Sequence, residues 1–224
     1  MTRLSSQSQR RGPGTRHTVW RWIGVLCGLL WLSMGVSCAA TSPAESWDED
    51  FESADAWRLG SDAVADVAVT GGQLQIHVLQ PGQVAWASTE QTWADLHVAV
   101  DAMQVSGPVD NEYGVLIRMD ADDHFYAFSI SGDGYARVAR FQDGAWSVLG
   151  PDWTPVAAIR EGMATNHLEV IAAGNTFEFR VNEQVVAQVG DEALQKGRLG
   201  LYAGAFGEAD VVVAFDNLHV EPVP

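Results

Sequence analysis

Polar and aromatic side chains recur along the middle of the sequence at positions where they could form a binding surface. If residues 113–119 form a strand, alternation places Arg118 on the face opposite Tyr113, Val115 and Ile117. Guanidinium and hydroxyl groups bond to the hydroxyl groups of a ligand, and an exposed indole offers a flat apolar face on which a sugar ring can stack. We therefore predict a ligand-binding surface made of Arg118, Ser129, Arg137 and Trp146.

Other tryptophans could belong to the same surface, and the competing interpretation is structural. Trp86, Trp93 and Trp153 also stand in predicted loops or at strand ends. A tryptophan in a β-sandwich more often packs in the core, and an arginine that points outward is usually only solvated. The sequence leaves both interpretations open for each of these residues.

The acidic residues do not form a recognisable catalytic pattern. A retaining glycosidase needs two carboxylates about 5 Å apart across the bond that it breaks. Residues 48–52 are rich in acids but stand where the domain begins, and Asp120, Asp122 and Asp123 stand in a turn. No serine occupies a Gly-x-Ser-x-Gly turn. The sequence therefore gives little support for an enzyme.

Short strands must position these residues, because apolar side chains alternate through most of the chain after Trp47. Turn sequences such as Gly71-Gly72 and Gly174-Asn175 separate pairs of alternating runs, as in β-hairpins. Only residues 191–194 suggest a helical turn. This spacing predicts an all-β fold, an antiparallel β-sandwich. Its predicted strands are 63–70, 73–79, 83–88, 94–105, 113–119, 124–131, 135–141, 145–149, 168–173, 176–181, 184–189, 197–205 and 211–220.

Six segments follow one another in a recognisable order: Gly114–Arg118, Phe125–Ile130, Asn166–Val170, Phe177–Asn182, Gly197–Tyr202 and Val213–Val220. This series resembles the concanavalin A-like lectin and glucanase jelly roll, particularly LamG-like and domain-of-unknown-function modules of exported bacterial proteins. The resemblance covers about residues 47–221. It implies two curved antiparallel sheets, often with sugar or peptide ligands on the concave face. The Glu-x-Asp-x-x-Glu strand of the glucanases in this family does not occur here.

A structural calcium ion is a further expectation of this resemblance, because the two ends of a jelly roll lie together. Asp50 (or Glu52) near the start and Asp216 near the finish offer hard oxygen ligands. The acids of the turn at 120–123 are a second candidate, and Asp216 could instead cap or bend the last strand. The six histidines show no ligand spacing, so we expect no zinc site.

Residues 1–37 are predicted to be a signal peptide or an N-terminal membrane anchor. Arginines up to Arg21 are followed by an apolar run of about 13 residues, the length of a signal sequence. Gly35-Val36-Ser37 then precedes Cys38, as in a bacterial lipobox, although leucine usually stands where Gly35 does. We predict lipidation at Cys38.

An uncleaved helix from about Val19 to Val36 and cleavage with release are the two alternatives to lipidation. All three place the domain outside the cytoplasm, with residues 38–46 as a tether before the folded part. We therefore expect an extracytoplasmic protein anchored at the cell membrane.

Charge and cysteine content restrict the partners. The chain carries a formal net charge of −16, and the part from Cys38 onward carries −21, because five arginines precede it. So acidic a surface repels nucleic acid, which we exclude as a partner. Cys27 and Cys38 both lie in or beside the leader, so the domain has no intrachain disulfide and no thiolate metal site.

The preferred functional interpretation is a binding module that recognises carbohydrate or another cell-surface polymer without catalysis. A divergent glycoside hydrolase is one alternative. An adhesion or structural module that binds another protein is the other. The sequence does not identify the ligand.

Overall fold

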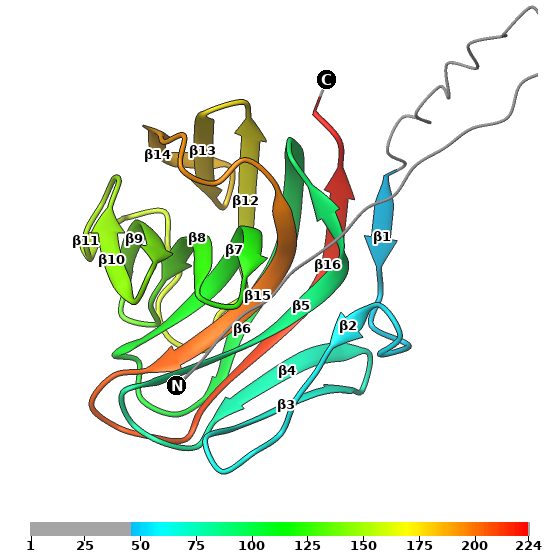
Figure 1. The fold of residues 1–224 in the computed structure, drawn as a ribbon. Helices are drawn as coiled ribbons and strands as arrows, with labels where there is room; N and C mark the ends of the chain where they lie inside the picture. Colours follow the sequence, from blue (N-terminus) through cyan, green and yellow to red (C-terminus); the bar gives the residue numbers. More distant parts are fainter. Residues whose placement is uncertain (1–45, 224) are drawn as a thin grey trace, which may run out of the picture. The chain divides into compact units, whose positions relative to one another are not determined.

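The computed structural model describes residues 46–223, which form two packed antiparallel β-sheets of eight strands each (Figure 1). No helix occurs in these residues. The predicted antiparallel β-sandwich is therefore confirmed.

The first sheet, sheet A, has the C-terminal strand near its centre. Its strands are β1 (Trp47–Glu49), β3 (Ala65–Thr70), β4 (Gln73–Val78), β6 (Leu96–Ser106), β12 (Asn166–Ala173), β13 (Thr176–Val181), β14 (Gln184–Gly190) and β16 (Val211–Glu221). Their order is β14-β13-β12-β6-β16-β4-β3, and β1 also pairs with β16. The last strand of the chain thus joins strands from its beginning and its middle.

The second sheet, sheet B, places β15 between strands from the first half of the chain. Its strands are β2 (Trp57–Arg58), β5 (Gln83–Trp93), β7 (Asn111–Ala121), β8 (His124–Ile130), β9 (Tyr135–Gln142), β10 (Ala145–Val148), β11 (Thr154–Pro155) and β15 (Gly197–Ala205). Their order is β10-β9-β8-β7-β15-β5-β2, and β11 pairs with β9.

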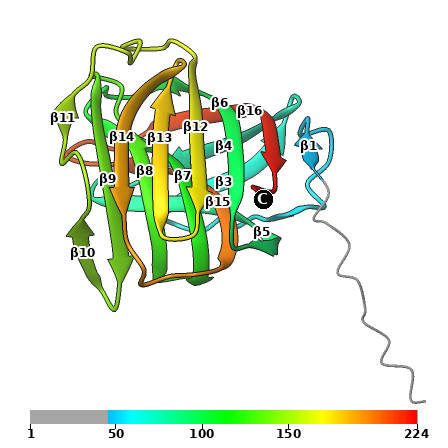
Figure 2. The ribbon, with the colours of Figure 1, turned by 90° about the horizontal axis from the view of Figure 1, so that it is seen from above.

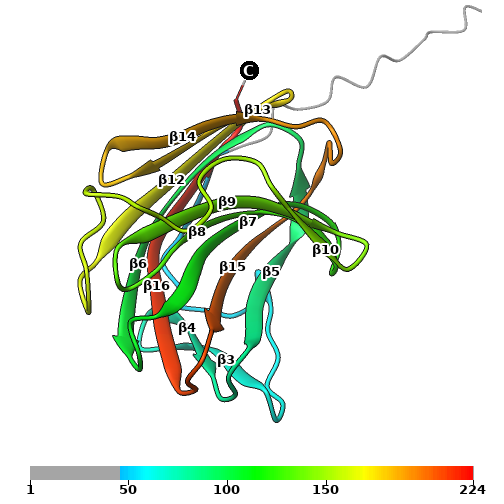
Figure 3. The same cartoon turned by 90° about the vertical axis from the view of Figure 1, so that its left-hand side faces the viewer.

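Side chains from the inner faces of the two sheets form one continuous core. Successive side chains of a strand point to opposite faces, so alternate residues of β4 and β6 are buried. Tyr126 of β8 lies 4.6 Å from Phe177 of β13, and Phe128 lies 5.8 Å from Phe179, measured between ring centroids. Figure 2 shows β12–β14 in front of β7–β9, and Figure 3 shows the curvature of the strands.

The start of the domain is fixed to its end. Trp47 of β1 lies opposite Val220 of β16, as expected for a jelly roll whose two ends lie together. The Trp47 ring also stacks on Trp93, with centroids 6.2 Å apart. Because Trp93 is only 4% exposed, the structural interpretation of this tryptophan is correct.

Most predicted strands agree with the structure, and the differences have local causes. Residues 197–205 form β15 with the predicted bounds. Three strands of two or three residues, β1, β2 and β11, are too short to show alternation. The helical turn predicted at 191–194 is wrong, because the Asp191 carboxylate accepts bonds from the Tyr126 hydroxyl (2.6 Å) and the Ala193 amide (2.8 Å) and holds a bend there.

The predicted leader, nearly all of the tether and the lipidation site at Cys38 lie outside the described residues. Within residues 46–223, no helix has the length and apolar character needed to cross a membrane.

Candidate binding site on the outer face of sheet B

A row of residues crosses the outer face of sheet B near its centre. The strand register places Tyr202 between Trp86 of β5 and Gly114 of β7. Gly114 in turn lies opposite Ser129 of β8, and Ser129 lies opposite Arg137 of β9. Five neighbouring strands therefore contribute one residue each to this row.

A second hydrophobic cluster covers the outer face beside the row. Leu116, Phe125 and Tyr202 are at most 5% exposed, although they do not belong to the main core. Trp86 and Phe141 pack against them, and the Phe125 and Phe141 ring centroids are 5.5 Å apart. An antiparallel sheet commonly leaves one face to water. Sheet B instead buries side chains on both faces, so the side chains of its outer face are packed against one another and held in place.

Glycines leave room on this face for larger neighbours. A Cβ atom at Gly114 would collide with a backbone oxygen of β8, and one at Gly204 would lie 2.7 Å from Cγ of Glu112. On β15, Gly200 and Gly204 flank Tyr202 on the outer face. Tyr202 therefore stands between two positions without side chains, where its hydroxyl can reach across Gly114.

Glu112, Tyr202 and Ser129 form a buried hydrogen-bonded group at the floor of this face. The Tyr202 hydroxyl donates to Oε2 of Glu112 (3.3 Å) and also hydrogen-bonds with the Ser129 hydroxyl. Burial raises the pKa of Glu112, and the Arg137 charge and the Tyr202 hydrogen bond only partly oppose this. Complete burial also raises the pKa of Tyr202, and the neighbouring Glu112 charge raises it further.

Arg137 lies beside this floor between two indole rings. Its Cζ atom is 4.6 Å from the ring centroid of Trp146 and 5.9 Å from that of Trp153. Its Nε atom lies 3.3 Å from Oδ1 of Asp152, and 15% of the side chain is exposed. Aromatic neighbours hold the planar guanidinium in one orientation. Arg137 can therefore present fixed hydrogen-bond donors to a ligand.

The loop between β10 and β11 brings Trp153 to the site. The Val138 amide donates to the Pro151 carbonyl (2.9 Å), and Thr154 pairs with Ala136 of β9. Trp153 adopts a φ of 45°, which is uncommon for a residue with a bulky side chain. Such strain persists only where the surroundings impose it, and it concentrates at functional sites.

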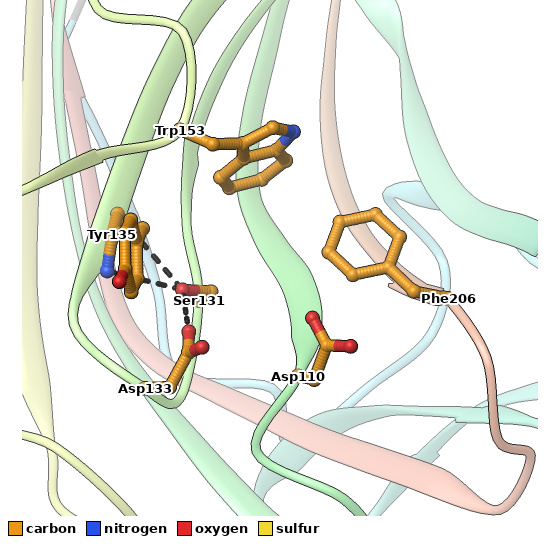
Figure 4. Close-up of a pocket in the computed structure, with 6 residues that line it drawn as sticks. All are labelled: Asp110, Ser131, Asp133, Tyr135, Trp153 and Phe206. Carbon is orange, nitrogen blue, oxygen red and sulfur yellow. Dashed lines mark hydrogen bonds between the residues drawn. The ribbon is translucent and has the colours of Figure 1, made fainter.

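A pocket of about 420 Å³ opens beside Trp153. It adjoins the row at Arg137, because the Trp153 ring is shared and Ser131 lies two residues beyond Ser129. Figure 4 shows that three aromatic side chains, two carboxylates and a serine surround it. The lining residues are Asp110, Ser131, Asp133, Tyr135, Trp153 and Phe206.

Solved structures share this fold, whereas no protein-family model and no curated protein matches the sequence. A carbohydrate-binding module, CBM66 from Bacillus subtilis, matches with a TM-score of 0.60 and 20% identity over 74% of this chain and 95% of that chain. The Crh5 transglycosylase in complex with NAG matches with a TM-score of 0.59 and 12% identity over 81% and 85%. A protein with a galectin-like fold from Bacillus subtilis matches with a TM-score of 0.57 and 11% identity over 79% and 94%. The domain has the fold of a lectin-like jelly roll.

Three of the four residues predicted to bind a ligand lie together in this fold. Ser129 and Arg137 are cross-strand neighbours, and Trp146 packs on Arg137 with 38% of its surface exposed. Trp86 and Trp153, which the sequence left open, lie on the same face. Their role in binding stays a prediction.

The outward placement predicted for Arg118 is wrong. The pairing of β7 shifts between Ile117 and Ala121, and Arg118 adopts a φ of 51°. Such a bulge interrupts the alternation of side chains. Met119 therefore joins the outer cluster, while Arg118 turns inward and is only 1% exposed.

The buried guanidinium of Arg118 connects three loops. It donates to the carbonyl oxygens of Ala94 (2.8 Å), Leu194 (3.0 Å) and Gly174 (2.6 Å), and to the carboxylate of Asp95 (3.1 Å). These partners use its donors inside the protein. The observed contacts of Arg118 are structural, and its side chain does not reach the outer face of sheet B.

Two residues of the site were not predicted from the sequence, although a signal for each exists. Glu112 alternates with Gly114 and Leu116, opposite the apolar series that begins at Tyr113. Tyr202 stands between two glycines at the same spacing in β15. Both residues lie on the strand face opposite the apolar face, among glycines. Inspecting that face of each predicted strand would have identified Glu112 and Tyr202.

The calcium site predicted from Asp50 and Asp216 stays a prediction. Asp50 accepts a hydrogen bond from the Glu52 amide (3.1 Å), and Asp216 accepts bonds from Gln73 (3.4 Å) and the Asn217 amide (2.8 Å). Within residues 46–223, no group of three His, Cys, Asp or Glu residues is arranged to hold a metal ion. The pairing of β16 shifts after Asp216, which agrees with the alternative that this residue bends the strand.

The acids of the turn at 120–123 are engaged with basic side chains. The His124 ring lies 3.2 Å from the Asp120 carboxylate, and the Arg198 guanidinium lies 2.6 Å from Asp122. The second calcium candidate, the acids of this turn, likewise stays a prediction.

Proposed function

We propose that the domain binds carbohydrate through the outer face of sheet B and does not cleave it. The observation that carries the proposal is Arg137, held between Trp146 and Trp153 beside the buried group of Glu112, Tyr202 and Ser129. A sugar ring has apolar faces and a rim of hydroxyl groups. Indole faces match the first, and the partly exposed guanidinium of Arg137 matches the second. Glu112, Tyr202 and Ser129 are buried, so they support this surface from below.

The solved structures that share the fold support this proposal. One is a carbohydrate-binding module, and another is a transglycosylase in complex with NAG. The packed outer face of sheet B supports the proposal independently of these similarities. Its hydrogen-bonding groups are held in place by the fold before any ligand binds. Such preorganisation lowers the entropy lost on binding.

A glycan array followed by calorimetry tests the proposal. Residues 44–224 are the suitable fragment, because both sheets and their core lie within 46–223. We expect Arg137→Ala and Trp153→Ala to weaken binding of the selected glycan by about tenfold or more, since each removes a desolvated contact worth about 1–2 kcal/mol.

Arg180→Ala is the matched control, because Arg180 lies on β13 of sheet A and is paired with Glu178. It should leave the affinity unchanged. Equal losses in Arg137→Ala and Arg180→Ala, or binding of a protein that free sugars do not displace, would contradict the proposal. The second result would favour an adhesion module.

Glycoside cleavage or transfer is a second candidate, and Glu112 is the observation that favours it. A buried carboxyl whose pKa is raised is the kind of group that acts as a general acid. Mass spectrometry of oligosaccharides incubated with the protein tests this. Products that disappear in Glu112→Gln would establish an enzyme, whereas unchanged oligosaccharides that still bind support the binding module.

We also propose that the leader carries the domain out of the cytoplasm and holds it at the membrane through a lipid on Cys38, with an uncleaved helix as the alternative. The basic, apolar and small-residue order of residues 1–43 supports this. Mass spectrometry of the membrane fraction should find Cys38 modified at a new N-terminus. An intact, unmodified N-terminus would refute lipidation.

A further inference from the structure

The pocket beside Trp153 has the lining of a site for an organic cation. We infer that it receives the protonated amino group of a sugar, so that the domain prefers polymers of amino sugars with free ammonium groups to neutral or acidic polymers. This inference rests on the proposed function and specifies its ligand class.

Aromatic rings form one part of the lining. The ring centroids of Trp153 and Phe206 are 5.3 Å apart with their planes at 82°, so the two rings meet edge to face. Tyr135 stands across the pocket from Phe206 and is 36% exposed (Figure 4). The face of an aromatic ring attracts a cation, and the attraction grows when the cation loses water. A three-sided aromatic wall therefore favours an ammonium group over a neutral amide.

Two carboxylates complete the lining on the side away from Trp153 (Figure 4). The hydroxyl of the fully buried Ser131 donates to Asp133 and accepts a bond from the Tyr135 amide (3.1 Å). Asp133 is thus fixed in orientation. Asp110 is exposed, and no hydrogen bond or ion pair within residues 46–223 occupies its carboxylate. Its charge is therefore free to pair with a ligand.

The nearby Arg137 does not cancel this charge. Its Nε atom is paired with Asp152 at 3.3 Å, and it also lies in the field of Glu112. Close opposite charges favour an ammonium ligand, and the same carboxylates repel a uronate or a sulfated sugar.

The whole domain reinforces this preference. The chain from Cys38 onward has a net charge of −21, which attracts a polycation from a distance and raises its rate of association. This long-range attraction alone would not distinguish one polycation from another. The pocket adds selectivity, because its aromatic rings and carboxylates together favour a cationic substituent beside the row.

Paired oligosaccharides test the inference on the full-length protein. Glucosamine oligomers and N-acetylglucosamine oligomers of equal length share one backbone, and acetylation removes the charge of each amino group. We expect the glucosamine oligomer to bind at least about tenfold more tightly, as one desolvated cation–π contact and one ion pair predict.

Asp110→Asn and Asp133→Asn should each reduce this preference severalfold and leave binding of the acetylated oligomer nearly unchanged. Asp55→Asn is the control, since Asp55 is an exposed acid in the loop between β1 and β2. Asp110→Asn also serves if Asp133→Asn fails to fold, because the Asp110 carboxylate holds no hydrogen bond in the described domain.

Equal binding of the two oligomers, or tighter binding of the acetylated one, would overturn the inference and leave the proposed function intact. The same loss in Asp55→Asn as in Asp110→Asn would also overturn it, because general surface charge would then explain the preference. If neither oligomer nor any arrayed glycan bound, the proposed function itself would fail.

Discussion

The carboxyl group of Glu112 lies among a tyrosine, a serine and an arginine on the outer face of sheet B, and it is only 6% exposed. Burial makes the charged form of a carboxylic acid unfavourable. The fold nevertheless retains this group, and Gly204 leaves the space that it occupies. A group held at such a cost is expected to serve the site rather than the core.

Glu112→Gln should change how stability depends on pH. The raised pKa means that the folded protein binds this proton more tightly than the unfolded chain does. Glu112 therefore contributes its stability below the ordinary glutamate pKa, and this stability is lost as the pH rises through the folded-state pKa. The melting temperature of the variant minus that of the natural protein should become more positive as the pH rises from about 4, near the ordinary glutamate pKa, through the raised folded-state pKa.

Differential scanning calorimetry across that range measures the trend. Glu183→Gln, in the exposed turn between β13 and β14, should keep a constant difference from the natural protein. A difference that stays flat for Glu112→Gln would show that the carboxyl is not desolvated in solution.

At the scale of elements, the bulge of β7 determines which side chains reach the outer face of sheet B. It turns Arg118 inward, where the guanidinium satisfies three carbonyl oxygens and one carboxylate from three loops. Arg118→Ala should lower the free energy of unfolding by roughly 3–5 kcal/mol, because it leaves buried acceptors without donors. Urea unfolding measures this loss.

Arg118→Lys should recover only part of that stability, since an ammonium group cannot reproduce the planar fork of donors. Affinity for the selected glycan should remain unchanged in every Arg118 variant that folds. A specific loss of affinity without a loss of stability would place Arg118 back in the binding site.

Strand β15 makes a second prediction at this scale. A Cβ atom at Gly204 would lie 2.7 Å from Cγ of Glu112 and 2.8 Å from Cγ1 of Val84, so Gly204→Ala must displace both side chains or the strand that carries the new methyl group. We expect a loss of about 1–3 kcal/mol in stability and weaker glycan binding. Gly207→Ala is the control, because a Cβ atom there has no neighbour within 4 Å.

The elements also show what the sequence could predict. Alternation and glycine turns located most strands, and they placed Ser129 and Arg137 on one face, because a regular strand repeats every two residues. Arg118 could not be placed, because its positive φ depends on loops that meet only in the folded protein. The sequence also could not tell core tryptophans from surface tryptophans. Trp93 lies in the core, whereas Trp146 lies on the surface.

At the scale of the whole molecule, the sandwich depends on its last two strands. β15 lies between β7 and β5 in sheet B, and β16 lies between β6 and β4 in sheet A. Deleting residues 211–224 removes β16 and exposes the inner face of sheet A. We expect this variant to lose its cooperative thermal transition and to bind a hydrophobic dye.

Deletion of residues 222–224 alone is the control, because β16 ends at Glu221. That variant should melt as the natural protein does. A cooperative transition in the chain that lacks residues 211–224 would show that sheet A closes without its central strand.

The central position of β16 also sets the order of events during synthesis. A ribosome makes β16 after every other strand of this domain, so β6 and β4 wait without their shared neighbour until β16 has been synthesised. Under the export proposed above, this delay would matter, because a closed sandwich could not pass through a narrow translocation channel. The connectivity of the strands would then keep the chain open until it reached the far side.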